Sequence, residues 1–444
     1  MTHSEQQAAE MWRSIIPVSG TVEHRMIECV KALEERGYDV SEARRLIPKG
    51  WDAYNVRDFR MLQKVIAMMW EALRRAPKMV SNDYLPDTFE ELKASWTAGA
   101  AGLGGMPRLT AYSVDSLNGV FRDKVYGAWY GKCIGCALGD PCAGWPSDKV
   151  RKERGKITDY VQKPDPRNDD INYQLLVLHA VDEYGPDFTS RDLAYEWVEH
   201  LDVDVTYTAE RQALENLHRG IIPPYSAREN NPFSHWIGAQ MRGEVHGLIA
   251  PGRPELAAEL AHRDAVISHV TEGVYGEVFN AVMVSLAFVM DDVEAIIGRA
   301  LGYVPAHSQF ASVVRSTVAK CKETGSWERV LDWINDTYGH LHWIHTFPNA
   351  AIVVMSLMLG GGDFTESVCM AASSGWDCDC STGQVGATVG ALVGERAIPD
   401  RWKEPIADRL YTDVAGFTVI ELSKLTDWTC DAARRLARAY DERG

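Results

Sequence analysis

The sequence lacks an apolar run long enough to cross a membrane. Its longest runs of this kind, such as residues 279–290, fall well short of the roughly 20 residues that a transmembrane helix needs. The first fourteen residues are polar and lack the apolar core of a secretory signal. We therefore expect a soluble, cytoplasmic protein with no membrane partner.

The chain also contains few basic residues relative to acidic ones, and few cysteines. The chain has 46 Lys and Arg residues against 62 Asp and Glu residues, a formal net charge of -16, and no basic run reverses this locally. Such a surface repels a phosphate backbone, so we expect no nucleic acid duplex as a partner. Nine cysteines in 444 residues give no disulfide framework, and cytosolic reduction would keep them as thiols.

What the chain does have is apolar residues at helical spacing. Hydrophobic residues make up 46% of the sequence, and between residues 22 and 76 they recur at three- and four-residue steps with charges between them. Alternating strand patterns are scarce, so the predicted fold class is all-α. Further helical segments are expected at 173–184, 255–262, 276–290, 312–321, 350–359 and 383–393.

A stretch rich in Gly and Ala at residues 98–105 interrupts the helical pattern and predicts a connector. We place a domain boundary between about residues 97 and 118. Residues 1–115 then form an N-terminal helical extension, and residues 116–444 form the main domain. The extension could cover a cleft, enlarge the core or make the contact of a homodimer.

The first segment with candidate functional residues runs from Gly375 to Thr382. Asp377 and Asp379 stand one residue apart, Ser381 follows, and glycines then recur at three- and four-residue steps. Such glycines allow a helix to pack closely, and two carboxylates at its start suit a cation. The alternative is a plain helix N-cap in which one Asp accepts backbone hydrogen bonds and the other faces water.

A second acidic turn, Asn168, Asp169 and Asp170, precedes another helical segment. All three side chains offer hard oxygen ligands, which Mg²⁺ and Ca²⁺ prefer. Taken alone, this turn too can be an ordinary helix start. Zinc is a poorer fit to Asp377-Cys378-Asp379-Cys380, because the segment lacks the Cys-x-x-Cys spacing and the histidines of structural zinc sites.

Together with a third segment, these turns resemble the ADP-ribosylglycohydrolase superfamily. Members open their domain with a pattern like GALLGLAIGDALGAPVEGW, and residues 127–145 read GAWYGKCIGCALGDPCAGW without a gap. The resemblance runs from about residue 120 to 425 and implies a compact multi-helix bundle. It also implies that the two acidic turns hold one or two Mg²⁺ ions, with Ca²⁺ or Mn²⁺ as alternatives. The implied metal ligands are Asn168, Asp169, Asp170, Asp377 and Asp379, and Ser381 is predicted as a further ligand.

The chain departs from the family pattern at three positions. Ala143 stands where many members have a Glu thought to act near the scissile bond, and Cys136 stands where they have an Asp. Cys380 replaces a Thr whose hydroxyl is a usual ligand, and a thiol is a poor ligand for Mg²⁺. Asp140 could substitute for the lost Glu, and Ser381 could supply the missing oxygen.

The resemblance also suggests roles in cleavage of a ribosyl bond, whose transition state is oxocarbenium-like. Asp169, Asp170 or Glu277 would deprotonate the attacking water, although Glu277 can equally be a carboxylate at a helix start. The predicted substrate-binding residues are Asp140, Trp145, His269, Tyr275 and Trp376, for which hydrogen-bonded or core positions are the simpler alternatives.

These features predict a Mg²⁺-dependent glycosyl hydrolase that cleaves an N- or O-ribosyl bond in an ADP-ribosyl or nucleoside-like small molecule. A second hypothesis is a catalytically impaired relative that binds ADP-ribose or a nucleotide, which Ala143 and Cys380 favour. A metal-dependent lyase or isomerase acting on a ribosyl substrate is the third.

Overall fold

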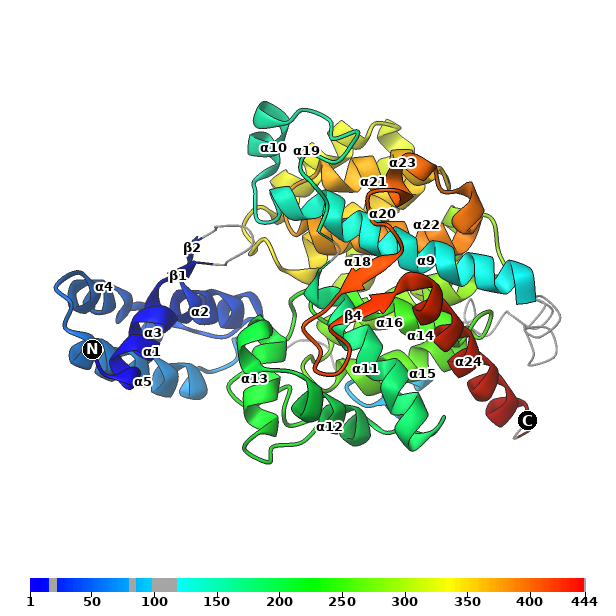
Figure 1. The fold of residues 1–444 in the computed structure, drawn as a ribbon. Coiled ribbons are helices and arrows are strands. Elements are labelled where there is room, and N and C mark those ends of the chain that lie inside the picture. The colour runs from blue at the N-terminus through cyan, green and yellow to red at the C-terminus, as the bar shows by residue number, and fades with distance from the viewer. Residues whose placement is uncertain (16–21, 80–84, 98–117, 166, 443–444) are drawn as a thin grey trace.

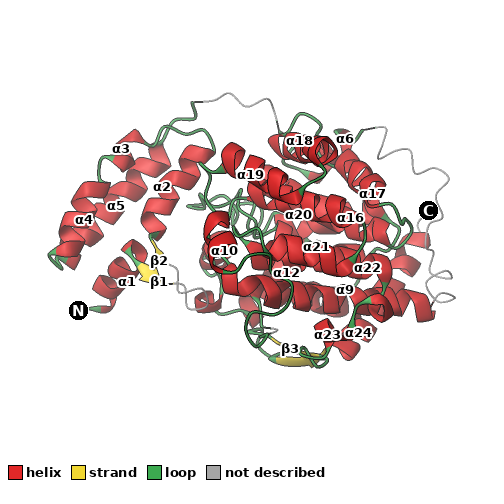
Figure 2. Ribbon diagram, turned by 90° about the horizontal axis from the view of Figure 1, so that it is seen from above, coloured by secondary structure: helices red, strands yellow, loops and turns green. Residues whose placement is uncertain are grey.

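A computed structural model describes residues 1–15, 22–79, 85–97, 118–165 and 167–442. Helices dominate the described chain, and its strands form two short antiparallel pairs, β1 with β2 and β3 with β4 (Figures 1 and 2). The all-α prediction is confirmed. The predicted connector at 98–105, and nearly all of the predicted boundary region, lie outside the described residues.

The N-terminal helices lie to one side of the main body (Figures 1 and 2). Helix α5 is amphipathic, and its apolar face, with Leu62, Val65 and Met69, packs in a small core that also includes Trp12. The N-terminal elements are α1 (His3–Trp12), β1 (Ser14–Ile15), β2 (Val22–Glu23), α2 (Arg25–Glu35), α3 (Ser41–Arg44), α4 (Ile47–Asn55) and α5 (Phe59–Arg75).

This small core continues into the main body. Trp236 belongs to it and stacks flat on His342, with ring centroids 4.3 Å apart. The Glu35 carboxylate accepts a hydrogen bond from the His342 backbone at 3.2 Å, and Arg36 donates one to the Asn231 carbonyl at 3.3 Å. The N-terminal helices are therefore joined to the rest by both apolar and polar contacts.

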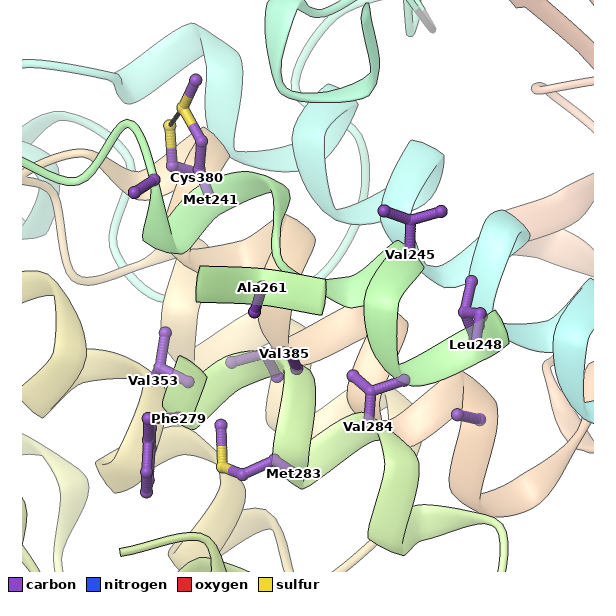
Figure 3. Packing of buried hydrophobic residues seen from close by; sticks show 14 of the residues in the cluster. Met241, Val245, Leu248, Ala261, Phe279, Met283, Val284, Val353, Cys380 and Val385 are labelled. Atoms are coloured by element: carbon purple, nitrogen blue, oxygen red, sulfur yellow. Dashed lines mark hydrogen bonds between the residues drawn. The ribbon is translucent and has the colours of Figure 1, made fainter. Parts of the chain in front are cut away.

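The main body is a bundle whose central helices carry few polar residues. Helix α16 is buried along its full length, as expected for a helix that is apolar on all sides. Figure 3 shows Phe279, Met283 and Val284 of this helix packed near Val353 of α20 and Val385 of α22.

The other elements of the main body follow in chain order. They are α6 (Phe89–Ala94), α9 (Asn118–Gly139), α10 (Ser147–Glu153), α11 (Asp169–Tyr184), α12 (Ser190–His200), α13 (Thr208–Leu217), α14 (Glu244–Ile249), α15 (Pro254–Ala265), α16 (Glu272–Ala287), α17 (Val293–Ala300), α18 (Gln309–Thr324), α19 (Trp327–Tyr338), α20 (Thr346–Gly360), α21 (Phe364–Ala372), α22 (Cys378–Val393), α23 (Asp400–Lys403), β3 (Arg409–Tyr411), β4 (Val419–Glu421) and α24 (Leu422–Asp441).

Helices α9 and α22 pack backbone against backbone through glycines. A Cβ added to Gly131 would lie 2.0 Å from the Gly386 carbonyl oxygen, and one added to Gly135 would lie 2.2 Å from that of Thr382. A side chain at either position would therefore push the helices apart. The two helices lie side by side (Figure 2). Gly139, at the end of α9, meets Cys378, so the start of α22 with the second acidic turn lies against the end of α9.

No helix in the described part of the chain is long and apolar enough to cross a membrane.

Candidate active site

A cavity of about 220 Å³ opens where the ends of several helices meet. The first acidic turn begins α11, the second begins α22, and Glu23 of β2 reaches the cavity from the N-terminal region. One side is apolar and aromatic, with Tyr207, Ile237 and Trp343. Eight carboxylic side chains line the cavity: Glu23, Asp140, Asp165, Asp169, Glu210, Asp377, Asp379 and Asp413.

A hydrogen bond joins the two acidic turns, although they lie more than 200 positions apart in the chain. Asn168 caps α11 by accepting a hydrogen bond from the Asp170 backbone at 3.0 Å, and its amide donates to Asp379 Oδ2 at 3.2 Å. Both the nitrogen and the oxygen of the Asn168 side-chain amide are thus hydrogen-bonded. The amide orients the Asp379 carboxylate, while its oxygen caps α11, and Asn168 lines the cavity.

The start of α22 is held in place by Asn349 of α20. The Asn349 side-chain oxygen accepts hydrogen bonds from the Asp377 backbone at 3.1 Å and from the Ser381 hydroxyl at 3.2 Å. Ser381 is fully buried and lies outside the cavity wall. Its hydroxyl therefore supports the turn, and the structure does not place it as a metal ligand.

The carboxylates in this wall are crowded. Burial, together with the charge of Asp379, raises the pKa of Asp377 well above its ordinary value. Burial and the charges of Asp170 and Asp379 do the same to the pKa of Asp169. One oxygen of Asp379, Oδ1, is buried without a hydrogen-bond partner among the described residues. A cation would relieve all three effects at once.

The residues present fit a divalent cation at this position. Asp169, Asp377 and Asp379 all line the cavity and offer hard oxygen donors. Ligand atoms of Asp377, Asp379 and Cys380 all lie within 4.8 Å of one another. The thiol of Cys380 is the soft member of the group and suits Mg²⁺ poorly.

The Asp170 carboxylate is hydrogen-bonded to other protein groups inside the bundle. Its Oδ2 accepts a hydrogen bond from the Lys132 ammonium group at 2.8 Å, and its Oδ1 accepts one from the Cys380 thiol at 3.2 Å. Lys132 also donates to Glu244 Oε1 at 3.0 Å and to the Met241 carbonyl at 2.6 Å. Asp170 was predicted to be a metal ligand or a base, but both of its oxygens are engaged inside the protein and it does not line the cavity.

Lys132 is an internal cation. Its side chain is 1% exposed, and those of Asp170 and Glu244 are 0% and 1% exposed. Burial alone would lower the pKa of Lys132, but the two carboxylates raise it well above its ordinary value, so the ammonium form is held. One fixed positive charge therefore lies directly behind the cavity wall.

Two carboxyl groups at the cavity have a pKa near neutrality. Burial, and then the charges of Asp379 and Asp165, raise the pKa of Asp140 to about 7. Burial raises the pKa of Glu210 to about 7, even though the Arg242 guanidinium 2.7 Å away favours the ionised form. Ala143 also lines the cavity, so the position of the usual family Glu offers only a methyl group there.

Glu277 lies deeper than predicted. It is fully buried behind Arg242, 3.0 Å from His246 Nε2, and it does not line the cavity. Burial and the nearby Asp264 raise the pKa of Glu277 well above its ordinary value. Glu210 faces the cavity from the opposite end of the same Arg242 network, so it is the carboxylate that this network presents to a ligand.

The four predicted aromatic and histidine contacts also lie outside the cavity wall. The Tyr275 hydroxyl donates to the Pro86 carbonyl at 2.6 Å, and buried His269 pairs with the Ser268 hydroxyl at 2.8 Å. Trp145 and Trp376 pair through their backbones, and the Trp376 indole N–H donates to the Asn335 side chain at 2.8 Å. These contacts are structural ones.

Several residues of the site were not predicted from the sequence. Lys132 had a visible signal, since it is the one charged residue in the stretch 125–139 of α9, which is otherwise made of small, apolar and aromatic residues. The others had none, because each reaches the cavity from a segment without a distinctive motif: Glu210, Tyr207, Trp343 and Asp413.

A bundle of buried helices with an acidic cavity at the joined starts of α11 and α22 defines an all-α protein suited to bind a cation. Comparison with known proteins agrees with the all-α class and makes it specific. ADP-ribosylglycohydrolase is the family that matches, over residues 118–444, and the chain belongs to it. The matched region begins at the first residue of α9 and leaves α1 to α6 outside.

Individual relatives are distant. The chain is 23% identical over 315 residues to an uncharacterized protein of Archaeoglobus fulgidus, a match that covers 68% of this chain and 97% of that protein. It is 25% identical over 198 residues to the uncharacterized protein YegU of Escherichia coli (strain K12), covering 37% of this chain and 58% of that one.

A solved structure, an ADP-ribosylglycohydrolase-related protein complex, is similar with a TM-score of 0.51 and 22% identity. The similarity covers 71% of this chain and 99% of that chain. It confirms the predicted fold.

Proposed function

We propose that the protein is a divalent-cation-dependent hydrolase that cleaves a ribosyl bond of a small molecule. Membership of the ADP-ribosylglycohydrolase family supports a glycohydrolase type of reaction. The observation that carries the cation dependence is the crowding of Asp169, Asp377 and Asp379 around one cavity, with Asp379 Oδ1 buried and without a partner in the described part of the chain. Mg²⁺ is the proposed ion, because the donors are hard oxygens.

The site is proposed to hold one cation rather than two. Asp169, Asp377 and Asp379 would hold it, while Lys132 supplies the second positive charge through its contact with Asp170. A cation bound there supplies charge that orients sugar hydroxyls and makes water more acidic. Asn168 contributes by fixing the Asp379 carboxylate.

Two carboxyl groups of the protein are proposed to transfer the protons of the reaction. In hydrolysis, water forms a bond to C1 of the ribose, the bond from C1 to the leaving group breaks, and the proton lost by the water is matched by one delivered to the leaving group. Asp140 and Glu210 line the cavity with pKa values of about 7, so each can either accept or donate a proton near neutral pH. Tyr207 and Trp343 offer faces against which a ring can pack.

The negative charge of the cavity limits the class of substrate that we propose. Among the described residues that line the cavity, Arg167 is the one basic residue, against eight carboxylic side chains. A bound divalent cation would neutralise only part of that charge, so a diphosphate would meet repulsion. We therefore favour a neutral or cationic ribosyl compound over free ADP-ribose as the substrate.

The test is a panel of ribosides and ADP-ribosyl compounds, assayed for release of a ribose-bearing product with Mg²⁺, Mn²⁺, Ca²⁺ or EDTA. We expect cation-dependent release from uncharged or cationic ribosides. Asp379→Asn should lower turnover by at least about a hundredfold, since even outer partners of a metal ion contribute about 10–100-fold. Asp52→Asn, at an exposed position in α4, is the control. Release that is unaffected by EDTA would refute cation dependence.

A second candidate is a binding protein without turnover. It is favoured by Ala143, which leaves the cavity without the usual family Glu. The same panel separates the two, because equilibrium binding of a riboside with no product at any pH between 5 and 9 would support the binding protein. Product release would support the hydrolase.

A further inference from the structure

A second cluster of ligand-type side chains lies away from the cavity, between α11, α12 and the β3–β4 hairpin. His179 Nδ1 donates to Glu196 Oε2 at 2.5 Å, and His200 Nε2 lies 3.5 Å from the same oxygen. Glu196 and His200 are four positions apart on α12, so both project from one face of that helix. The three ligand atoms all lie within 4.8 Å of one another.

The hydrogen bond on the far side of His200 fixes which of its nitrogens is free. His200 Nδ1 lies 2.9 Å from the Ala415 carbonyl oxygen, which can only accept, so Nδ1 carries the hydrogen. In the neutral ring, Nε2 then presents a lone pair toward the carboxylate of Glu196. Nε2 is buried and has no hydrogen-bond partner among the described residues. Two facing lone pairs repel each other unless a positive charge lies between them.

The surroundings suit a bound ion. The ion pairs of Glu196 in the described part of the chain are with His179 and His200, so no Lys or Arg there competes for it. The two imidazole rings lie 5.0 Å apart, and Phe417 of the hairpin packs against both, at 5.4 and 5.9 Å. The side chain of Glu196 is 2% exposed, while those of His179 and His200 are 22% and 14% exposed, which leaves a path for entry.

We propose that His179, Glu196 and His200 form a site for a transition-metal ion of the Zn²⁺ type. Two imidazoles and one carboxylate are a ligand set typical of Zn²⁺, with water completing the coordination. Ligands at about 2.0–2.2 Å from a tetrahedral ion stand roughly 3.4 Å apart, and the separations of 2.5 and 3.5 Å to Glu196 bracket this value. His179 binds through Nδ1 once its hydrogen has moved to the other ring nitrogen. The hydrogen bond from His200 Nδ1 to a carbonyl is the support that metal-bound histidines usually have.

Such an ion would stabilise the elements that form the cavity wall without lining the cavity itself. Helix α11 carries Asp169 at its other end, and the residues between β3 and β4 include both Asp413, in the cavity wall, and Ala415. Metal at the cluster would tie α11 and α12 to this hairpin. The role is structural and does not depend on the proposed hydrolase activity.

Zn²⁺ itself is the probe, added to the full chain after metal removal, in an Asp379→Asn background that weakens binding at the cavity. Calorimetry should give one Zn²⁺ per chain at this cluster. His200→Gln or His179→Gln should weaken it at least tenfold, because even outer partners of a metal contribute that much. His218→Gln, at an exposed position directly after the neighbouring α13, should leave it unchanged. Equal Zn²⁺ affinity with and without the His200→Gln change would overturn the site.

A second measurement needs no substitution at the cluster. In the unmodified chain, Zn²⁺ should slow the reaction of His179 and His200 with diethyl pyrocarbonate, read by mass spectrometry of peptides, while exposed His218 reacts at an unchanged rate. Mg²⁺ should give no protection. Equal modification rates of the two histidines with and without Zn²⁺ would refute the proposal even if the variants fail to fold.

Discussion

Replacement of Lys132 by Met tests whether an internal ammonium group balances the charge behind the cavity. Met keeps most of the length of the side chain and removes its charge and its hydrogen bonds. In the native protein the ammonium group contacts Asp170 at 2.8 Å, Glu244 at 3.0 Å and the Met241 carbonyl at 2.6 Å, and all of these groups are buried. The variant would leave two buried carboxylates without a cation.

The expected loss follows from that geometry. Removing one partner of a buried ion pair costs about 3–5 kcal/mol, because the remaining charge is uncompensated. Both carboxylates can limit the loss by taking up a proton. Burial already raises the pKa of Asp170 and of Glu244 in the presence of Lys132, and the variant would raise both further. A carboxyl with a raised folded-state pKa contributes stability at low pH that is lost as the pH rises through that pKa. We therefore expect a loss of about 3–5 kcal/mol at pH 8 and a smaller loss at pH 5.

The assay is urea unfolding followed by tryptophan fluorescence, at both pH values and with or without millimolar Mg²⁺ or Mn²⁺. Added cation should stabilise Lys132→Met more than the native protein, because Asp170 and Glu244 then become available as ligands. The triple variant with Asp170→Asn and Glu244→Gln is the matched control, and it should not show this extra stabilisation. The reasoning fails if Lys132→Met is as stable as the native protein at pH 8, or if the native protein binds two divalent cations at the cavity.

Two further changes test packing and charge at the same site. Gly131→Ala would place a Cβ 2.0 Å from the Gly386 carbonyl oxygen and should lower the free energy of unfolding by at least about 1–3 kcal/mol; Gly119→Ala, on the same helix with open space around it, should be neutral or slightly stabilising in the same urea titration. Asp140→Asn, measured in EDTA, should be more stable than the native protein by about 2–4 kcal/mol above pH 7, because burial and Asp379 raise the pKa of Asp140 to about 7 and the stability of its protonated form is lost between about pH 4 and 7. The two proteins should converge below pH 4, and a constant difference across the range would contradict the raised pKa.

Much of the fold could be predicted because it depends on local pattern. The helical spacing of apolar residues predicted an all-α protein. The glycines that follow Asp379 predicted a helix that packs closely, and Gly386 does meet Gly131 of α9 backbone to backbone. That the two acidic turns meet was implied by the family resemblance and not by local pattern, and the bond from Asn168 to Asp379 joins them.

The rest depended on contacts between distant segments, which no local pattern encodes. Glu277 resembled a useful acid because it was expected at the start of an apolar, small-residue helix, where partial burial could raise its pKa, but α16 points it at Arg242 and away from the cavity. Glu210 is the acid that reaches the cavity, and in the sequence it is one charged residue among many on an amphipathic helix. Only the position of α13 beside the cavity distinguishes it.

Two of the departures from the family pattern contact the same residue in the structure. Cys136 and Cys380, at positions where members have Asp and Thr, both face Asp170, with sulfur to oxygen distances of 3.7 and 3.2 Å. Burial raises the pKa of both thiols well above their ordinary value, so both are neutral. A divalent cation beside an ionised Asp contributes one net positive charge, and the Lys132 ammonium beside a neutral Cys136 contributes the same. The Lys132 ammonium beside a neutral Cys136 thus supplies one net positive charge next to Asp170, which supports the proposal of a single metal position.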